Sequence, residues 1–313
     1  MNLRLTLQGF DLLLMEAAVS EIMDQRKDVA VHPRLGAAPC IYDPVGQEVL
    51  QELYQGFINV ARQGGLPLLV TAPTWRTNRE RVVEAGVNPE INRHGVDFIK
   101  SIRDQAGDSA SMISVGGLLG CKNDAYKPEQ GLSPDQGEKF HSWQAERLAA
   151  AGAEYLMAAT LPAVPEALGL ARAMAATGVD FIVSFVINRQ GCILDGHTLA
   201  EAFQIIDDGC RPQPLGYMVN CAYPSFLQAD SEPQSVFSRL IGYQANGSSL
   251  DHAELDNADG MLADDISDWA GRMMALNQRF GIKILGGCCG TTSEHLKALV
   301  SLVSGKAGKS GFD

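Results

Sequence analysis

The segment EYLMAATLPAVPEALGLARAMAATGVDFIVSFV, residues 154–186, indicates the fold class of this chain. It contains two short apolar runs, EYLMAAT at 154–160 and FIVSFV at 181–186, on either side of a longer stretch. In that stretch apolar residues recur at spacings of three and four, and a glycine follows its end. The pattern predicts a β-strand, an α-helix and a second β-strand.

The same alternation extends through the chain in both directions. Six further apolar runs are separated by segments of helical character: LLLM at 12–15, PLLVTA at 67–72, SMISVGG at 111–117, PLGYMVN at 214–220, IGYQAN at 241–246 and KILGG at 283–287. Eight strands alternating with helices favour an α/β fold of the (β/α)8 TIM barrel type over an open doubly wound sheet. We therefore expect a single barrel domain over residues 1–303, followed by a mobile tail over 304–313 that is rich in glycine and lysine.

Composition excludes several classes of protein. The formal net charge of −12, with no cluster of basic residues, argues against nucleic acid or an anionic membrane surface as a partner. No apolar run approaches the roughly 20 residues of a membrane span, and we expect a cytoplasmic protein. The seven cysteines are odd in number and irregularly spaced, which argues against a secreted disulfide framework.

Three of the cysteines occupy comparable positions. Cys221 follows the sixth apolar run directly, and Cys288 and Cys289 follow the eighth. In a barrel both strand ends open onto the face where catalytic residues collect. Buried free cysteines often pack simply as small hydrophobic residues, and that alternative stays open for each of them.

The vicinal cysteines can serve one metal ion only if the chain turns between them, because adjacent residues of a regular strand point to opposite sides. Gly286, Gly287 and Gly290 flank the pair and give the chain that freedom. Three thiolates would leave a tetrahedral Zn2+ with one open position, as in catalytic zinc sites. A substrate thiol that enters this position would lose its proton.

Two motifs carry a family resemblance. LGGCCGTTSEHL at 285–296 and MVNCAYPSF at 218–226 closely resemble the zinc motifs of the homocysteine S-methyltransferase family. A weaker similarity covers most of the chain, including GVDFIVSFVINRQGCILDGHTLAEAF at 178–203. The resemblance implies a barrel with Cys221, Cys288 and Cys289 as zinc ligands, homocysteine as the acceptor, and a sulfonium, ammonium or cobalamin-bound methyl group as the donor.

The chain departs from the family where the amino group of homocysteine is held. The family has an Asp-Gly motif after its first strand, where this chain has Met15-Glu16, and a glutamate after its fourth strand, where this chain has Ala159. Without those acids an ammonium group loses a charge-assisted contact. Glu16 is a candidate to take over this role from one position along.

Three other residues are candidates for substrate binding. Asn220 precedes the first cysteine and could orient a substrate carboxylate or a ligand. Ser184 would line the pocket, and Trp75 would face a cationic donor. For each of these residues a purely structural role is an alternative.

The sequence is therefore consistent with three functions. The first is a zinc-dependent S-methyltransferase that converts homocysteine to methionine, and any corrinoid donor would then be carried by a separate protein. The second is a divergent member of the family that uses another thiol acceptor or acts as a demethylase-type transferase. The third is a zinc or thiol sensor without turnover. Assembly into a homo-oligomer is left open.

Overall fold

The structure, a computed structural model, describes residues 3–255 and 260–307. Eight parallel strands form a closed barrel in the order of the sequence, with each strand paired to the next and β8 paired to β1. They are β1 (Leu13–Met15), β2 (Leu68–Thr71), β3 (Ile113–Leu119), β4 (Tyr155–Leu161), β5 (Phe181–Phe185), β6 (Gly216–Ala222), β7 (Leu240–Ala245) and β8 (Ile284–Gly287). The predicted (β/α)8 barrel is confirmed, and each strand overlaps one of the eight apolar runs.

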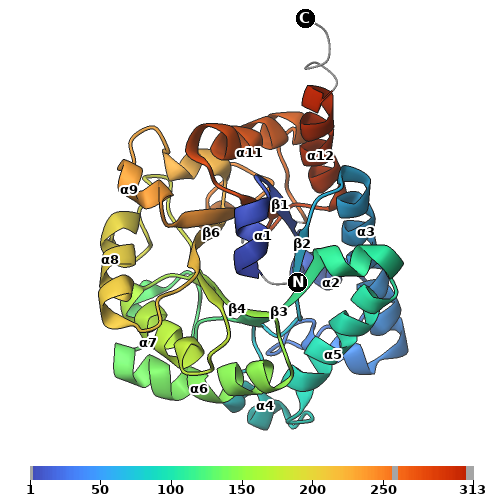
Figure 1. Cartoon of the computed structure of the whole chain (residues 1–313). Coiled ribbons are helices and arrows are strands. Elements are labelled where there is room, and N and C mark those ends of the chain that lie inside the picture. Colours follow the sequence, from blue (N-terminus) through green and yellow to red (C-terminus); the bar gives the residue numbers. More distant parts are fainter. Residues whose placement is uncertain (1–2, 256–259, 308–313) are drawn as a thin grey trace, which may run out of the picture.

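Helices surround the barrel on all sides (Figure 1). They are α1 (Leu3–Gly9), α2 (Val19–Gln25), α3 (Pro44–Gly64), α4 (Arg79–Ala85), α5 (Ile91–Asp104), α6 (Pro134–Ala150), α7 (Val164–Ala175), α8 (Leu199–Gly209), α9 (Gln234–Phe237), α10 (His252–Leu255), α11 (Ile266–Phe280) and α12 (Ser293–Ala307). Short 3-10 helices are η1 (Ala38–Tyr42), η2 (Gly107–Met112), η3 (Pro128–Gln130) and η4 (Pro224–Leu227). In the described part of the chain, none of the helices has the length and apolar character that a membrane crossing requires.

Local sequence explains where the helices begin. At the start of α6 the Ser133 hydroxyl accepts a hydrogen bond from the Gln136 amide, and the Gln136 side chain accepts one from the Ser133 amide. This capping box satisfies two donors that the helix itself leaves unpaired. Thr198 and Glu201 form the same arrangement at the start of α8. At the other end of the chain, α12 extends four residues into the segment 304–313 that was expected to be a tail, and residues 308–313 lie outside the described residues.

Two apolar layers hold the barrel together. The outer layer lies between the strands and the helices, and the inner layer fills the barrel with buried side chains such as Met15, Met157, Ile182 and Met218. Tyr155 also lies inside, and its ring fits only because Gly116 has no side chain, since a Cβ at Gly116 would come within 2.4 Å of the ring. The interior is therefore packed solid and does not form a pore.

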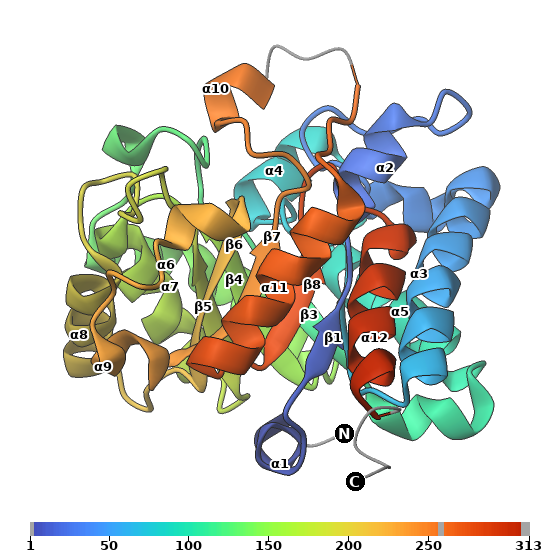
Figure 2. The same ribbon diagram turned by 90° about the horizontal axis from the view of Figure 1, so that it is seen from above.

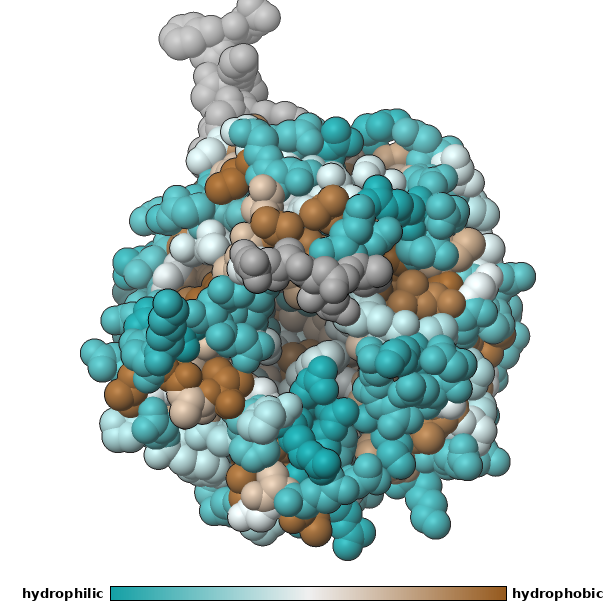
Figure 3. Space-filling view, turned by 180° about the vertical axis from the view of Figure 1, so that it is seen from behind, coloured by the Kyte–Doolittle hydropathy of each residue, from teal (hydrophilic) through white to brown (hydrophobic). Residues whose placement is uncertain are grey.

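The two ends of the barrel differ. Helix α1 lies across the amino-terminal end, where Leu3 and Leu7 pack on the inner layer (Figures 1 and 2). The loops that follow the strands, with α2, α4 and α10, lie at the opposite end (Figure 2). Seen from that end, the surface is hollowed near its centre and is mostly hydrophilic around the hollow (Figure 3). The carboxyl end is therefore the one open to small molecules.

Candidate active site at the carboxyl end of the barrel

Three cysteines from two strand ends converge at the open end. The sulfurs of Cys221, Cys288 and Cys289 lie within 4.8 Å of one another. In the described ranges 3–255 and 260–307, no other three histidine, cysteine or acidic side chains are gathered in this way. Cys221 is buried, while Cys288 and Cys289 are half-buried. One small ligand can therefore touch all three sulfurs.

The position of Cys221 corrects one detail of the sequence prediction. Cys221 does not follow the sixth strand but lies inside β6, where the pairing with β7 shifts register between Asn220 and Ala222. Its φ is +53°, a left-handed conformation that is rare for residues other than glycine. This conformation breaks the alternation of the strand, so that the side chains of Asn220 and Cys221 lie side by side.

The turn that carries Cys288 and Cys289 is fixed by hydrogen bonds on two sides. The Cys288 amide donates to the Ala245 carbonyl at 2.7 Å, and the Cys289 carbonyl accepts from the Gly247 amide at 2.7 Å. On the other side, the Gly290 amide donates to Oε2 of Glu21 at 2.5 Å. The turn is thus held between the end of β7 and helix α2.

Gly290 makes this turn feasible. Its φ is +77°, and a Cβ at this position would come within 2.2 Å of the Leu262 carbonyl oxygen. The flanking glycine noted in the sequence is therefore needed both for the backbone conformation and for space.

A buried polar network supports Cys221. Oδ1 of Asn220 accepts hydrogen bonds from the Ser184 hydroxyl at 2.7 Å and from the Thr160 amide at 2.9 Å. Nδ2 of Asn220 donates to Oγ1 of Thr160 at 2.6 Å and to the Cys221 sulfur at 3.3 Å. All of the hydrogen-bonding capacity of the Asn220 amide is used. Ser184 and Asn220, two sequence candidates, therefore lie next to the cysteine cluster.

The charge balance of the cluster suits a cation. The contact with the Cys221 sulfur, together with burial, raises the pKa of Cys288 and of Cys289 well above that of a free thiol. Three thiolates cannot share this space without a counter-charge. A bound divalent cation would supply that charge and would deprotonate the thiols.

A further buried acceptor at the carboxyl end of the barrel has no partner among the residues that the structure describes. Oδ1 of Asn246, a 2 % exposed residue directly after β7, has no hydrogen-bond partner among the described residues. The next residue, Gly247, is bonded to Cys289. Buried polar atoms are rarely left unpaired, and a bound group would resolve this one. The cysteine set and this orphan oxygen together fit a site that takes a metal ion and a ligand.

Tyr126 was not identified from the sequence. Its side chain hydrogen-bonds to Cys221, and burial, followed by the charges of the three cysteines, raises its pKa well above the ordinary value. Tyr126 comes from the loop between β3 and α6, and the sequence offers no signal that this loop folds over the strand ends. Only the three-dimensional arrangement places its phenol at the cluster.

Glu166 fixes the loop that carries Tyr126. Its carboxylate accepts hydrogen bonds from the Lys122 amide at 2.7 Å and from the Leu132 amide at 3.2 Å, one on each side of Tyr126. The buried His141 ring also lies at hydrogen-bond distance, 2.9 Å. Burial alone would raise the pKa of Glu166, but these contacts outweigh it and hold the pKa below its usual value. The carboxylate is therefore an anion that ties both ends of the loop to α7.

Glu16 lies directly after β1 but faces the neighbouring strand. Its carboxyl group accepts a hydrogen bond from the Thr71 amide at 2.7 Å and also contacts the Thr71 hydroxyl. Burial raises the pKa of Glu16 to about 8, although the Thr71 bonds oppose this shift. Both oxygens of Glu16 are thus engaged, and none of its described contacts reaches the cysteines.

Trp75 contacts the end of strand β4. Its indole nitrogen donates to the Ala159 carbonyl at 3.1 Å, and the Arg76 guanidinium lies 4.6 Å from the centre of its ring. Arg76 is therefore already the cation on one face of this ring. Met15 and Ala159, which occupy the positions of the expected acids, are both buried.

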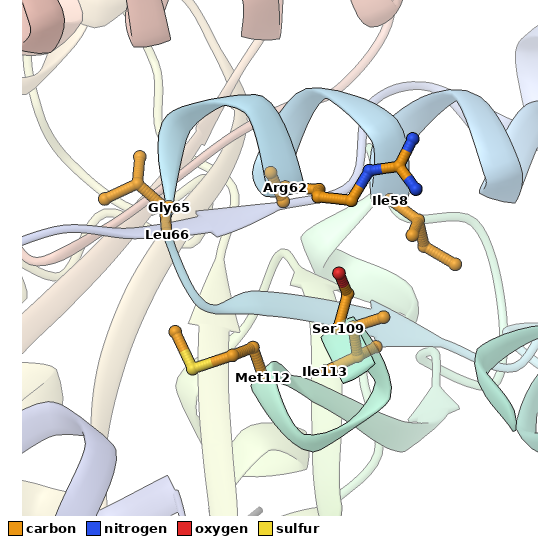
Figure 4. Close-up of a pocket in the computed structure, with 8 residues that line it drawn as sticks. Ile58, Arg62, Gly65, Leu66, Ser109, Met112 and Ile113 are labelled. Atoms are coloured by element: carbon orange, nitrogen blue, oxygen red, sulfur yellow. The ribbon is translucent and has the colours of Figure 1, made fainter. Parts of the chain in front are cut away.

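An apolar cavity lies at the other end of the barrel. It has a volume of about 110 Å³ and lies between the end of α3 and η2, lined by residues that include Ile58, Leu66 and Met112 (Figure 4). Because η2 precedes β3, this cavity is at the amino-terminal end of the barrel, away from the cysteines.

Comparison with known proteins is consistent over nearly the whole chain. The sequence model of the family described as homocysteine S-methyltransferase matches residues 13–303. A homocysteine S-methyltransferase of Escherichia coli (strain K12) is 23% identical over an alignment of 314 positions that covers 95% of this chain and 97% of that protein.

Solved structures show the same fold. The metallated form of the homocysteine methyltransferase MmuM from Escherichia coli superposes with a TM-score of 0.75 at 18% identity, covering 96% of this chain and 100% of the other. The apo form of the same enzyme gives 0.67 at 19% identity, covering 96% and 99%.

Proposed function

This chain belongs to the homocysteine S-methyltransferase family, and from that premise we propose that it methylates homocysteine with a zinc ion held by Cys221, Cys288 and Cys289. Membership of the family makes it an S-methyltransferase enzyme. The observation that carries the proposal is the convergence of three sulfurs within 4.8 Å at the open end of the barrel. Thiolate ligands of this kind select zinc among the common divalent ions of cells.

The zinc ion would supply an open coordination position in which the acceptor thiol ionises. The protein contributes the setting for that chemistry. Asn220 donates a hydrogen bond to the Cys221 sulfur and so favours its thiolate form. Hydrogen bonds to Ala245, Gly247 and Glu21 keep the other two cysteines in place. We assign Ser184 and Asn220 to the support of Cys221.

The methyl donor would reach the acceptor sulfur from the open face. A sulfonium or ammonium donor is cationic, and the net charge of −12 favours its approach. A corrinoid donor would arrive on a separate protein. The contact of Trp75 with a cationic donor and the cytoplasmic location stay predictions, and assembly into a homo-oligomer stays open.

A second candidate, methylation of a different thiol, has one observation in its favour. Met15 and Ala159 leave two expected acid positions without charge, and Glu16 is bonded to Thr71. A thiol without an amino group would not need those acids.

One experiment tests the proposal and separates the alternatives. The purified protein is analysed for zinc and then incubated with S-methylmethionine and either L-homocysteine or a simple thiol, with Cys288→Ala as control. We expect one zinc per chain, methionine as product, and loss of both in the variant. Methylation of the simple thiol alone would favour the second candidate. Bound zinc without any turnover would favour a sensor, and full zinc affinity in Cys288→Ala would overturn the site.

A further inference from the structure

Homocysteine carries an ammonium group four bonds from its sulfur. When the sulfur lies at the cysteine cluster, the ammonium must lie close to the same strand ends and needs an anionic partner there. The uncharged side chains of Met15 and Ala159 do not offer one. The partner must therefore be another acid at the rim.

Glu16 is poorly suited to this task. Its two carboxyl oxygens already contact the amide and the hydroxyl of Thr71. Burial also raises its pKa to about 8, so the group is largely neutral near pH 7. A neutral carboxyl group that is already hydrogen-bonded gives an ammonium no charge to pair with.

Glu21 differs from Glu16 in its exposure and in its hydrogen bonds. It lies in the first turn of α2 and is half-buried. Oε2 accepts the Gly290 amide at 2.5 Å, next in the chain to Cys289, whereas Oε1 has no hydrogen bond to any part of the chain that the structure describes. Its carboxylate is also close enough to Cys221 for that sulfur to add to the effect of burial in raising its pKa.

We propose that Glu21 binds the ammonium group of the acceptor through Oε1, while Oε2 remains on the Gly290 amide. This role rests on the proposed function. It makes Glu21 the residue that selects an amino-acid thiol over a thiol acid of the same length. The positive charge of the ammonium group offsets the desolvation of the carboxylate and so favours its ionised form. Asp24, one turn further along α2, adds negative potential to the same side.

The test compares two acceptors that differ only in the ammonium group, L-homocysteine and 4-mercaptobutyrate. Glu21→Gln removes the charge but keeps an amide oxygen for the Gly290 bond. We expect the wild-type enzyme to prefer homocysteine, and Glu21→Gln to lower that preference in kcat/KM by about 10- to 100-fold, mainly through KM for homocysteine. Calorimetric binding of the two thiols should show the same loss, and zinc content should not change.

Two variants make the result specific. Glu146→Gln removes an exposed charge on α6 and should leave the preference unchanged. Glu16→Gln is the competing variant. If it removes the preference and Glu21→Gln does not, Glu16 is the ammonium partner and the proposal is overturned.

Three other results also count against the proposal. If Glu21→Gln weakens both thiols equally, Glu21 acts only through the Gly290 turn. If the wild-type protein neither binds nor methylates homocysteine, the proposed function fails and this role fails with it. A wild-type enzyme that prefers homocysteine, together with a Glu21→Gln variant that keeps the preference, would overturn the role of Glu21 alone.

Discussion

The side-chain nitrogen of Asn220 lies 3.3 Å from the sulfur of Cys221, its own neighbour in strand β6. Two consecutive residues of a regular strand cannot make this contact, because their side chains point to opposite faces. The left-handed conformation of Cys221 permits it. Non-glycine residues in that conformation cost about 1–3 kcal/mol, and such strain is concentrated at functional sites.

Loss of this contact should weaken metal binding. Asn220→Ala removes the donor to Cys221 and the bonds to Ser184 and Thr160. We expect zinc affinity to fall about 10- to 100-fold, as for other partners of metal ligands. Competition with a chromophoric chelator measures the change. Ser184→Ala, which removes one bond at the far side of the amide, should have a smaller effect, and equal effects of the two variants would contradict this account.

The turn at Gly290 should tolerate no side chain. Gly290→Ala places a Cβ against the Leu262 carbonyl, whereas Gly281→Ala, at φ +73°, has open space around it. In both variants alanine must adopt a left-handed backbone conformation, which costs about 1–2 kcal/mol. Urea unfolding should show a larger loss for Gly290→Ala, and only this variant should lose zinc affinity. A similar loss of affinity in Gly281→Ala would point to a general effect on folding.

Glu16 should make the protein less stable as the pH rises. Its pKa is about 8 in the folded protein, against 4.5 for the ordinary carboxyl group. Between these values the unfolded chain binds fewer protons than the folded protein, so the free energy of unfolding falls with increasing pH. The contribution is at most about 1.4 kcal/mol per pH unit. The slope is close to zero below pH 4.5 and above pH 8. The accumulated loss of stability is therefore absent below pH 4.5 and constant above pH 8.

Glu16→Gln isolates this effect, because glutamine is neutral at every pH and can keep both contacts with Thr71. Urea unfolding at several pH values from 4.5 to 8 should show the variant gaining stability relative to the wild type as pH rises. Parallel curves would mean that Glu16 is ionised in the folded protein, and would also remove one argument for Glu21 as the ammonium partner.

Glu166 should be needed to hold the loop that carries Tyr126 in its folded conformation. Glu166→Ala removes the acceptor of the Lys122 and Leu132 amides and the partner of His141. Each lost bond to a charged group is worth about 1.5–3 kcal/mol, so the expected loss of stability is at least about 3 kcal/mol. Hydrogen exchange should accelerate at Lys122 and Leu132 before it changes in the strands. Glu201→Ala, at the exposed α8 cap, provides a control with an expected cost of about 1 kcal/mol.

Much of this fold follows from periodicity. The eight apolar runs correspond to the eight strands because strands buried on both faces must be apolar along their whole length. The start of α6 at Ser133-Pro134 also follows from local sequence, because capping depends on neighbouring residues only. The cysteines could be placed at one end of the barrel because parallel strands bring their carboxyl ends together.

Contacts between distant segments cannot be predicted from such local patterns. No sequence pattern indicates that Tyr126 reaches Cys221, or that Glu21 bonds to Gly290, because both contacts depend on how loops fold over the strand ends. The direction of the Glu16 side chain was also open, since residues after a strand no longer follow its alternation. The left-handed conformation of Cys221 is a tertiary effect with no local signal.

Helix α1, which closes the amino-terminal end of the barrel, also constrains the order of events during turnover. Because the barrel interior is packed solid and α1 covers its amino-terminal end, acceptor and donor share the entrance at the carboxyl end. On the proposed assignment the acceptor sulfur binds at the cysteines, and the donor approaches that sulfur from the solvent side. Turnover should therefore follow an ordered sequence in which the acceptor is the first to enter and the methylated thioether is the last to leave.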